Sequence, residues 1–266
     1  MNILFAADSG YQRRLQICIR SFLRFPPEEG YDIYLMHSDW TEEEQEEFQG
    51  QIGEGARVHF IYVDPQIFAD FPDNKRYPKL IYYRIYAAHF LPKDMKRILY
   101  LDGDTIVINS LEELYHMDME GYYYCACTHV KKVLNKINQI RLGTEEEYAY
   151  INSGVLLMNL ELLRKEQKVD EIKEYVKERG MFFTLPDQDV ITALYGEKIK
   201  IIDTLKYNLS DRILHIHNAN LTKERIDLDW IRKNGVVIHY YGKNKPWDDN
   251  YFGKLDVFYH EVEKVK

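Results

Sequence analysis

The chain has 266 residues, 45% of them hydrophobic, and a formal net charge of −8. This length and apolar content predict one large folded domain, residues 1–266, or one domain with a small appendage. The acidic balance and the lack of a Lys/Arg-rich run argue against nucleic acid as a partner.

Cysteine usage and the N-terminus indicate the compartment. The three cysteines, Cys18, Cys125 and Cys127, cannot form a closed disulfide framework, which favours a reduced, cytoplasmic protein. The stretch MNILFAADSG lacks the regions of a signal peptide, and no apolar run reaches the roughly 18 residues of a transmembrane span. The sequons at Asn208 and Asn220 are then chance matches. Peripheral contact with the inner face of a membrane stays open, and so does the oligomeric state.

The first 110 residues alternate buried strands with amphipathic helices. We predict strands at 2–8, 31–38, 56–64 and 97–104, and helices at 11–25, after Thr41, at 77–91 and after Ser110. Two helix starts carry the pattern of a capping box, Thr41 with Glu44 and Ser110 with Glu113. The order predicts an α/β fold whose mainly parallel sheet carries helices on both faces and binds ligands beyond the carboxyl ends of its strands.

The second half of the chain is less regular. Strands are predicted at 121–130, 149–160, in KIKIID and in GVVIHYYG, with helices at 161–179, ending at Gly180, and at 186–196. The segment ILHIH is also predicted to be a strand, which would place His215 and His217 on one face.

The stretch RILYLDGD ends an apolar strand with two carboxylates. Residues i and i+2 of an extended chain point the same way, so Asp102 and Asp104 can share one cation while Gly103 admits a ligand near the backbone. Mg²⁺ and Mn²⁺ prefer such oxygen ligands and often share them with a diphosphate. A solvated turn or a helix cap is the alternative. Two further Asp-x-Asp triplets, at 187–189 and 227–229, are not expected to bind metal.

A third metal ligand is available in VVIHYYGKNKPW. His239 ends an apolar strand, and its imidazole suits Mn²⁺ better than Mg²⁺. Gly242 permits close backbone approach, and Lys245 supplies a positive charge for phosphate. A hydrogen-bonded core histidine is the alternative for His239, and the pair His215 and His217 competes as a metal site.

Several of these stretches jointly resemble one family. ILFAADSGY, RILYLDGDTIVINSLEELY, INSGVLLMNL, LPDQDVIT and HYYGKNKPW occur in the order typical of retaining glycosyltransferase family eight, which includes glycogenin. The likeness extends from residue 3 to about residue 250 and is weakest over 205–235. It implies a GT-A fold with a nucleotide-binding half, 1–110, and a half for the donor sugar and acceptor, 111–266.

The resemblance also implies site residues and a cofactor. Mn²⁺, or alternatively Mg²⁺, would be held by Asp102, Asp104 and His239. The UDP-sugar donor would contact Ala6, Asp8 and Tyr11 at the uridine, Arg84 and Gly103 near the diphosphate, Asn152, Asp187 and Gln188 at the sugar, and Gly242 with Lys245 in a closing loop.

The implied reaction moves galactose or glucose from a UDP-sugar to a glycan, lipid-linked or protein acceptor. The metal and Lys245 would stabilise the departing diphosphate. We favour attack from the leaving-group face, with Gln188 and Asp187 positioning the sugar. His129 stands where many members carry a carboxylate that helps select the sugar, so the donor's identity stays open.

Alternatives to this function also stay open. A haloacid-dehalogenase-like phosphatase carries a similar Asp-x-Asp, but it usually has Thr or Val where this chain has Ile106. An inactive UDP-sugar-binding protein and a self-glucosylating enzyme are two others. Single residues could also have purely structural roles: Asp8 and Asp187 as helix caps, and Asn152 as a hydrogen-bond partner for a bulged backbone.

Overall fold

The structure is a computed structural model that describes residues 1–73, 78–129 and 134–264. Its strands are β1 (Asn2–Ala6), β2 (Tyr31–His37), β3 (Ala56–Tyr62), β4 (Arg97–Leu101), β5 (Thr105–Val107), β6 (Tyr124–Thr128), β7 (Ile151–Asn159), β8 (Ile199–Ile201) and β9 (Val237–His239). Its α-helices are α1 (Gln12–Leu23), α2 (Glu42–Ile52), α3 (Ala87–Phe90), α4 (Glu112–Tyr115), α5 (Asn135–Leu142), α6 (Leu160–Glu166), α7 (Val169–Arg179), α8 (Pro186–Tyr195), α9 (Thr204–Tyr207), α10 (Asp211–Asn218), α11 (Leu228–Asn234) and α12 (Asp256–Glu263).

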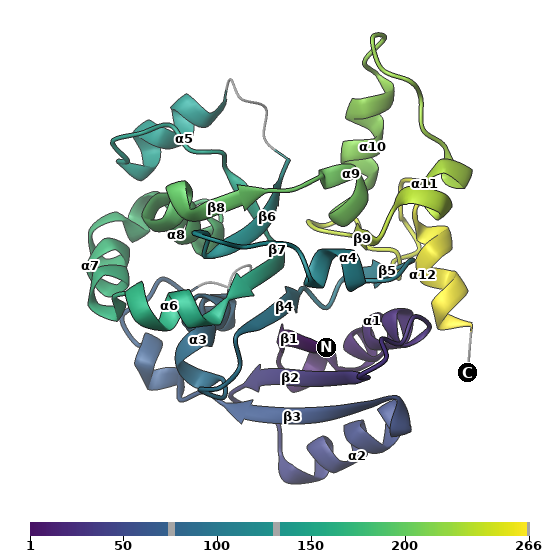
Figure 1. The fold of residues 1–266 in the computed structure, drawn as a ribbon, viewed down its shortest axis with the longest axis horizontal. Coiled ribbons are helices and arrows are strands. Elements are labelled where there is room, and N and C mark those ends of the chain that lie inside the picture. Colours follow the sequence, from purple (N-terminus) through teal and green to yellow (C-terminus); the bar gives the residue numbers. More distant parts are fainter. Residues whose placement is uncertain (74–77, 130–133, 265–266) are drawn as a thin grey trace.

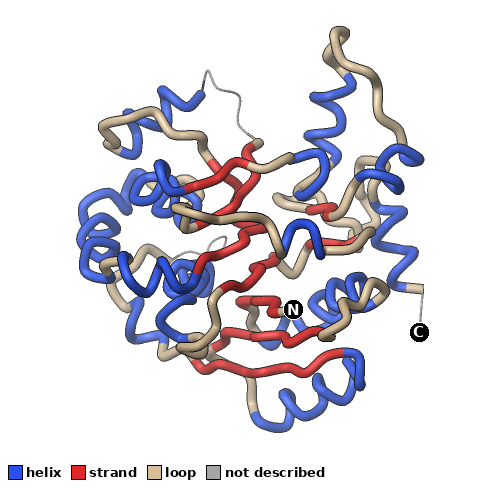
Figure 2. The backbone as a smooth tube through the Cα atoms, viewed as in Figure 1, coloured by secondary structure: helices blue, strands red, loops and turns tan. Residues whose placement is uncertain are grey.

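A seven-stranded sheet in the order β3-β2-β1-β4-β7-β6-β8 forms the centre of the molecule (Figure 1). Strands β3, β2, β1 and β4 pair in parallel, β7 is antiparallel to both β4 and β6, and β8 is parallel to β6. This is the mainly parallel mixed sheet that the alternating pattern predicts. Figure 2 shows the strands crossing the middle of the molecule with helices around them.

Helices cover both faces of this sheet because its strands are apolar on both sides. In β1, Ile3 and Phe5 belong to a core cluster with Leu15 and Phe22 of α1. The intervening Leu4 belongs to a second cluster, together with residues of α3, α6, α7 and α8. Alternate strand residues point to opposite faces, so one continuous apolar run supplies both cores.

A second, two-stranded sheet joins the middle of the chain to its C-terminal part. Strand β5 pairs antiparallel with β9, and Thr105 lies opposite His239. A third apolar cluster of residues from α10, α11 and α12 packs on these strands. This pairing places the end of the Asp-Gly-Asp segment beside a strand that follows it by more than a hundred residues.

Most of the predicted elements are present. The capping box at Thr41 and Glu44 is confirmed, since each side chain bonds the other residue's backbone N–H. The helix over 186–196 is confirmed as α8, with Gly196 following its last residue. Tyr77 and Val130, at the ends of two predicted segments, lie outside the described residues.

Four local predictions are wrong. Most of the predicted helix 77–91 is a 3₁₀ helix, Lys79–Tyr86, and only Ala87–Phe90 is α-helical. The predicted helix 161–179 is two helices, α6 and α7, separated at residues 167–168. ILHIH lies in helix α10. At the start of α4, Ser110 Oγ accepts from Glu112 N, while Glu113 pairs with Lys206, so no capping box forms there.

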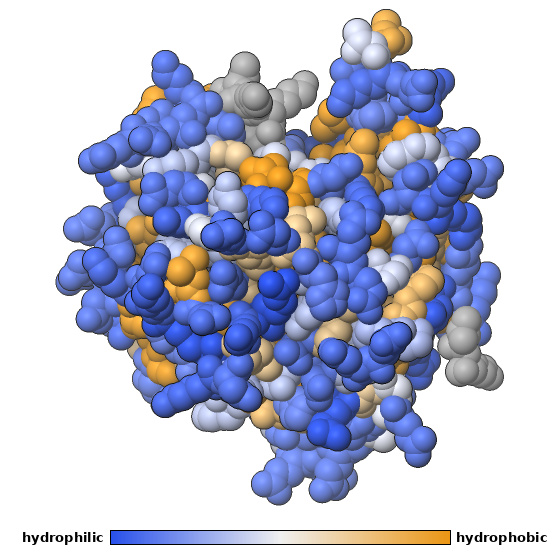
Figure 3. Space-filling view, viewed as in Figure 1, coloured by the Kyte–Doolittle hydropathy of each residue, from blue (hydrophilic) through white to orange (hydrophobic). Residues whose placement is uncertain are grey.

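The surface is mostly polar on the face shown in Figure 3, with apolar residues in scattered spots. Within the described part of the chain, no helix has the length and apolar character needed to cross a bilayer.

Candidate active site

A cavity of about 850 Å³ opens at the carboxyl ends of the parallel strands. It is lined by residues from both predicted halves of the chain. All of the predicted site residues border it: Ala6, Asp8, Tyr11, Arg84, Asp102, Gly103, Asp104, Asn152, Asp187, Gln188, His239, Gly242 and Lys245. The structure therefore brings together the side chains that the motifs single out, from segments spread over the whole sequence.

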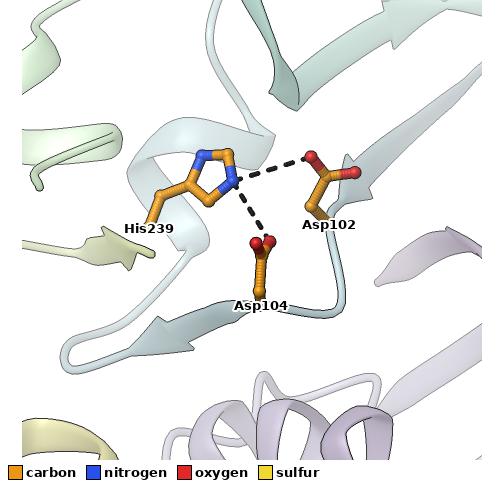
Figure 4. Close-up of side chains that lie close together, drawn as sticks. All are labelled: Asp102, Asp104 and His239. Carbon is orange, nitrogen blue, oxygen red and sulfur yellow. Dashed lines mark ion pairs between the residues drawn. The ribbon is translucent and has the colours of Figure 1, made fainter. Parts of the chain in front are cut away.

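Asp102, Asp104 and His239 line this cavity, and their side chains point toward one another (Figure 4). The Nε2 atom of His239 lies 3.2 Å from Asp104 Oδ1 and 3.6 Å from Asp102 Oδ2. One ligand atom from each residue lies within 4.8 Å of the others. Asp102 follows β4, Asp104 precedes β5 and His239 ends β9, so the β5–β9 pairing brings the third ligand to the first two.

This donor set fits a hard divalent cation. The His239 side chain is 1% exposed, yet its Nε2 has no hydrogen-bond donor or acceptor partner among the described residues. Adjacent ligands about 2.1 Å from an octahedral ion are about 3 Å apart, close to the separation of Nε2 from the Asp104 oxygen. Two carboxylates and one imidazole are ligands that divalent cations accept.

Lys245 lies against one of these carboxylates, that of Asp104. Its Nζ donates to Asp104 Oδ2 and, at 2.8 Å, to the backbone oxygen of Tyr240. Burial raises the pKa of the Asp104 carboxyl, but the positive charges of His239, when it is protonated, and of Lys245 outweigh burial and hold that pKa below its usual value. Gly242 adopts a φ of 88°, a conformation that favours glycine, in the turn that returns the chain to Lys245.

Arg84 connects the two acidic groups of the cavity. Its guanidinium is 3.0 Å from Asp102 Oδ1 and 3.2 Å from Asp187 Oδ2, and it donates to the backbone oxygen of Ser153. Ser153 Oγ also donates to Asp187, at 2.5 Å, and Tyr100 donates to Asp102 at 2.8 Å. Arg84 is 5% exposed, so in this structure it holds two carboxylates in place.

Asp187 is not a helix cap. Helix α8 has Leu185 at its N-cap position, and Asp187 lies inside the first turn with its carboxylate turned to Arg84 and Ser153. Burial raises the pKa of the Asp187 carboxyl, opposed by these two partners. The neighbouring Gln188 has a buried Oε1 that lacks a hydrogen-bond partner among the described residues, so this atom is available to a ligand.

Two glycines allow the close approach of side chains in the site. A Cβ on Gly103 would lie 2.7 Å from the ring of Tyr11. A Cβ on Gly154 would lie 2.2 Å from Cε1 of His239 and 2.5 Å from Oδ2 of Asp102. Neither position has room for a side chain without displacing a residue of the site.

The competing metal sites do not form. His215 and His217 lie on helix α10, where residues two apart do not share a face, and His217 contacts the backbone oxygen of Glu224. Asp227 caps α11 by accepting from Trp230 N. Asp189 is buried against Arg141 and Tyr150. The only triad of possible metal ligands in the described residues is the one at Asp102, Asp104 and His239.

The structural role considered for Asn152, bonding to a bulged backbone, is present in part. Strand β7 pairs irregularly with β6 between Ala126 and Cys127, and Asn152 Oδ1 accepts from the backbone N–H of Gly154 there. For Asp8 the structure shows no side-chain capping bond at the short helix that follows it. Asp8 is exposed at the cavity rim.

Sequence reasoning missed several residues around the site. Asn208, dismissed as a chance sequon, is 2% exposed, and its Oδ1 contacts His239 Nδ1 at 2.9 Å. Trp247 lies edge-on to Tyr11, with Arg14 over its ring at 4.9 Å. The INSG motif already contained Ser153 and Gly154. No sequence pattern marks Asn208, because its partner is 31 residues away.

His129 lies in the cavity wall, stacked on Tyr241 with ring centroids 5.2 Å apart. Burial lowers its pKa to about 4, with smaller contributions from Arg212 and His239. The imidazole is therefore neutral near pH 7, so this position carries no charge toward a ligand.

Comparison with known proteins identifies the family. The family described as glycosyl transferase family 8 matches residues 2–251. The chain belongs to glycosyl transferase family 8. As predicted, it is therefore a glycosyltransferase, and the family match disfavours the phosphatase alternative.

Relatives of this family 8 chain are distant but cover nearly all of it. It is 24% identical to the lipopolysaccharide 1,2-glucosyltransferase of Escherichia coli, over 93% of this chain and 73% of the relative. It is also 24% identical to general stress protein A of Bacillus subtilis, over 94% of this chain and 88% of the relative.

Solved structures confirm the GT-A fold. An active-site mutant of LgtC superposes with a TM-score of 0.83 at 24% identity, covering 99% of this chain and 95% of LgtC. Galactosyltransferase LgtC in complex with donor and acceptor sugar analogs superposes with a TM-score of 0.80 at 23% identity, covering 98% and 95%.

Proposed function

We propose that this glycosyltransferase moves a hexose, galactose or glucose, from a UDP-sugar to a carbohydrate or lipid-linked acceptor, with retention of configuration and with bound Mn²⁺. The observation that carries the proposal is the convergence of Asp102, Asp104 and His239 in a cavity lined by all of the family-like motifs. Relatives with lipopolysaccharide glucosyl- and galactosyltransferase names support the hexose.

The chemistry requires stabilisation of a leaving diphosphate. A metal held by Asp102, Asp104 and His239 would supply Lewis-acid stabilisation of the charge that develops there. Lys245 lies beside Asp104, which supports a role in which its ammonium contacts phosphate oxygens bound next to that carboxylate. A general acid of the kind that glycosidases use is then unnecessary, because the leaving group is already stabilised as an anion.

The sugar would be oriented by the opposite wall of the cavity. Gln188 offers its unpaired Oε1, and Asp187 is held by Arg84 and Ser153. A carboxamide is a weak nucleophile, which favours attack from the leaving-group face over a covalent intermediate. In this proposal the Asp187 charge and the Gln188 oxygen steady the positive charge that develops on the sugar ring.

The uridine would lie near the carboxyl end of β1. Ala6, Asp8 and Tyr11 border the cavity there, and the Tyr11 ring is available for stacking on a base. Gly242 and Lys245 belong to the loop that would cover the diphosphate. The proposed role of Arg84 differs from the one that the sequence implied, which was a position near the diphosphate. Because Arg84 pairs with Asp102 and Asp187, its main contribution in this proposal is to orient these two carboxylates.

A panel of UDP-sugars with Mn²⁺ tests this function. We expect release of UDP from one hexose donor, loss of that activity with EDTA, and recovery on adding Mn²⁺. Asp104→Asn should lower the rate by about 100-fold or more. Asp229→Asn makes the same change in another Asp-x-Asp triplet, at the exposed start of α11, and should leave the rate unchanged.

Two results would overturn the proposal. One is metal-independent release of UDP at the wild-type rate by Asp104→Asn. The other is tight binding of UDP-sugars without transfer or hydrolysis for any donor, which would favour the inactive binding protein. Intact-mass measurement after incubation with the donor separates self-glucosylation from transfer to a second molecule.

A further inference from the structure

A row of buried amides connects the irregular part of β7 to the imidazole of His239. Asn152 Oδ1 accepts from Gly154 N at 3.1 Å and from Asn208 Nδ2 at 2.7 Å. Asn208 Oδ1 in turn lies 2.9 Å from His239 Nδ1. Asn152, Asn208 and His239 are 4%, 2% and 1% exposed, so solvent does not compete for these bonds.

The direction of every bond in this row follows from one backbone group. The Gly154 N–H can only donate, so the Asn152 atom facing it must be the oxygen. That oxygen also faces Asn208, whose nearer atom must then be the NH₂ nitrogen. The remaining Asn208 atom is an acceptor, and a neutral His239 must therefore carry its proton on Nδ1.

Protonation on Nδ1 leaves Nε2 with a free lone pair. This is the atom that lies 3.2 Å from Asp104 Oδ1 and has no hydrogen-bond partner among the described residues. A metal ligand must present an unprotonated nitrogen, and a partner on the other ring nitrogen usually determines the tautomer and the ring orientation. We propose that Asn208, held by Asn152, is the positioning residue that makes His239 competent to bind the divalent cation.

The inference rests on the proposed metal site and deepens it. It gives Asn152 a second role besides contact with the sugar, because its oxygen is used to hold Asn208. It also assigns a role to Asn208, a residue that the family resemblance did not single out. Loss of such a partner typically weakens metal binding by about 10- to 100-fold.

Calorimetric titration with Mn²⁺, in the absence of any UDP-sugar, tests the proposal without an activity assay. Asn208→Leu keeps the branched shape of the side chain but removes the acceptor, and should weaken Mn²⁺ binding by about 10- to 100-fold. Asn208→Asp keeps an acceptor for Nδ1–H but loses the donor to Asn152 Oδ1, so its loss of Mn²⁺ affinity should be smaller than that of Asn208→Leu. Asn220→Leu, the same change at an exposed position on the loop after α10, is the matched control and should bind as the wild type does.

The tautomer gives a second readout that a merely structural role would not move. In the metal-free protein labelled with ¹⁵N-histidine, the His239 signals, assigned by their loss in His239→Gln, should report a proton on Nδ1. In Asn208→Leu they should shift toward the Nε2–H form. This measurement on the wild-type protein remains decisive even if Asn208→Leu does not fold.

Three outcomes would overturn the inference: a wild-type His239 protonated on Nε2, Mn²⁺ affinity within two-fold of wild type for a folded Asn208→Leu, or equal losses in Asn208→Leu and Asn208→Asp. Failure of the proposed function is distinguishable. It would appear as absent Mn²⁺ binding in the wild type while His239 still carries its proton on Nδ1.

Discussion

Gly154→Ala is expected to disable the metal site by steric displacement alone. The added Cβ would lie 2.2 Å from Cε1 of His239 and 2.5 Å from Oδ2 of Asp102. Carbon atoms in contact lie about 3.5 Å apart, so the imidazole or the strand must move by the difference from 2.2 Å, about 1.3 Å. Crowding of this kind in a packed interior costs about 1–3 kcal/mol of the free energy of unfolding.

Mn²⁺ affinity should fall together with stability. A displacement of about 1 Å exceeds the precision that a metal or catalytic site requires, so we expect Mn²⁺ binding to weaken at least about 10-fold. Urea unfolding measures the free energy of unfolding, and calorimetry with Mn²⁺ alone measures the affinity. Both are needed, because a folded protein that has lost its metal site is the expected result.

Gly50→Ala is the matched control. Gly50 lies at an exposed position of α2, and a Cβ there meets nothing within 4 Å. Alanine is the better helix former by about 0.5–1 kcal/mol, so this variant should be as stable as the wild type or slightly more, with unchanged Mn²⁺ affinity. If Gly154→Ala kept wild-type stability and Mn²⁺ affinity, the close packing around His239 would be refuted.

Two further predictions concern charge. Lys245→Met removes the ammonium from Asp104, so Mn²⁺ measured without donor should bind several-fold more tightly, by about 1 kcal/mol. Turnover should fall about 100-fold, because the ammonium no longer stabilises the leaving diphosphate. Weaker Mn²⁺ binding in this variant would contradict a competition between Lys245 and the metal for Asp104. His129 has a pKa lowered from 6.5 to about 4 by burial, so its contribution to stability is complete above pH 6.5 and is lost as the pH falls through about 4. His129→Gln should therefore lose less of its free energy of unfolding across this range than the wild type in urea titrations, and parallel curves would show that another group is responsible.

Local sequence patterns predicted much of the sheet. The continuous apolar runs of β1 and β4 determine strands that are buried on both faces, and Thr41 with Glu44 determines the start of α2. These features depend on residues that are close together in the sequence, so they can be predicted from the sequence alone. The Asp-Gly-Asp segment after RILYL belongs with them, since a charged pair ending a buried strand predicts a site at the edge of the sheet.

Other elements were decided by tertiary contacts. ILHIH alternates like a strand, but Ser210 caps a helix there by accepting from Ile213 N, and Leu214 packs into the third cluster. The residues Lys79–Tyr86 carry a helical period, yet they form a 3₁₀ helix whose tyrosines fill the core around Phe68. Packing of large side chains overrides a weak local preference.

The sequence by itself determined the α/β order of the chain, the carboxylates at a strand end and the family to which they belong. Its division into two functional halves stays a prediction. The family resemblance predicted His239 as the third ligand, but only the tertiary structure showed that the pairing of β9 with β5 brings it to Asp102 and Asp104. Only the tertiary structure showed that Asn208 contacts the imidazole. The reason is physical, because these contacts join segments that lie tens to more than a hundred residues apart in the sequence. Local periodicity does not encode which distant strand or side chain will form a buried hydrogen bond.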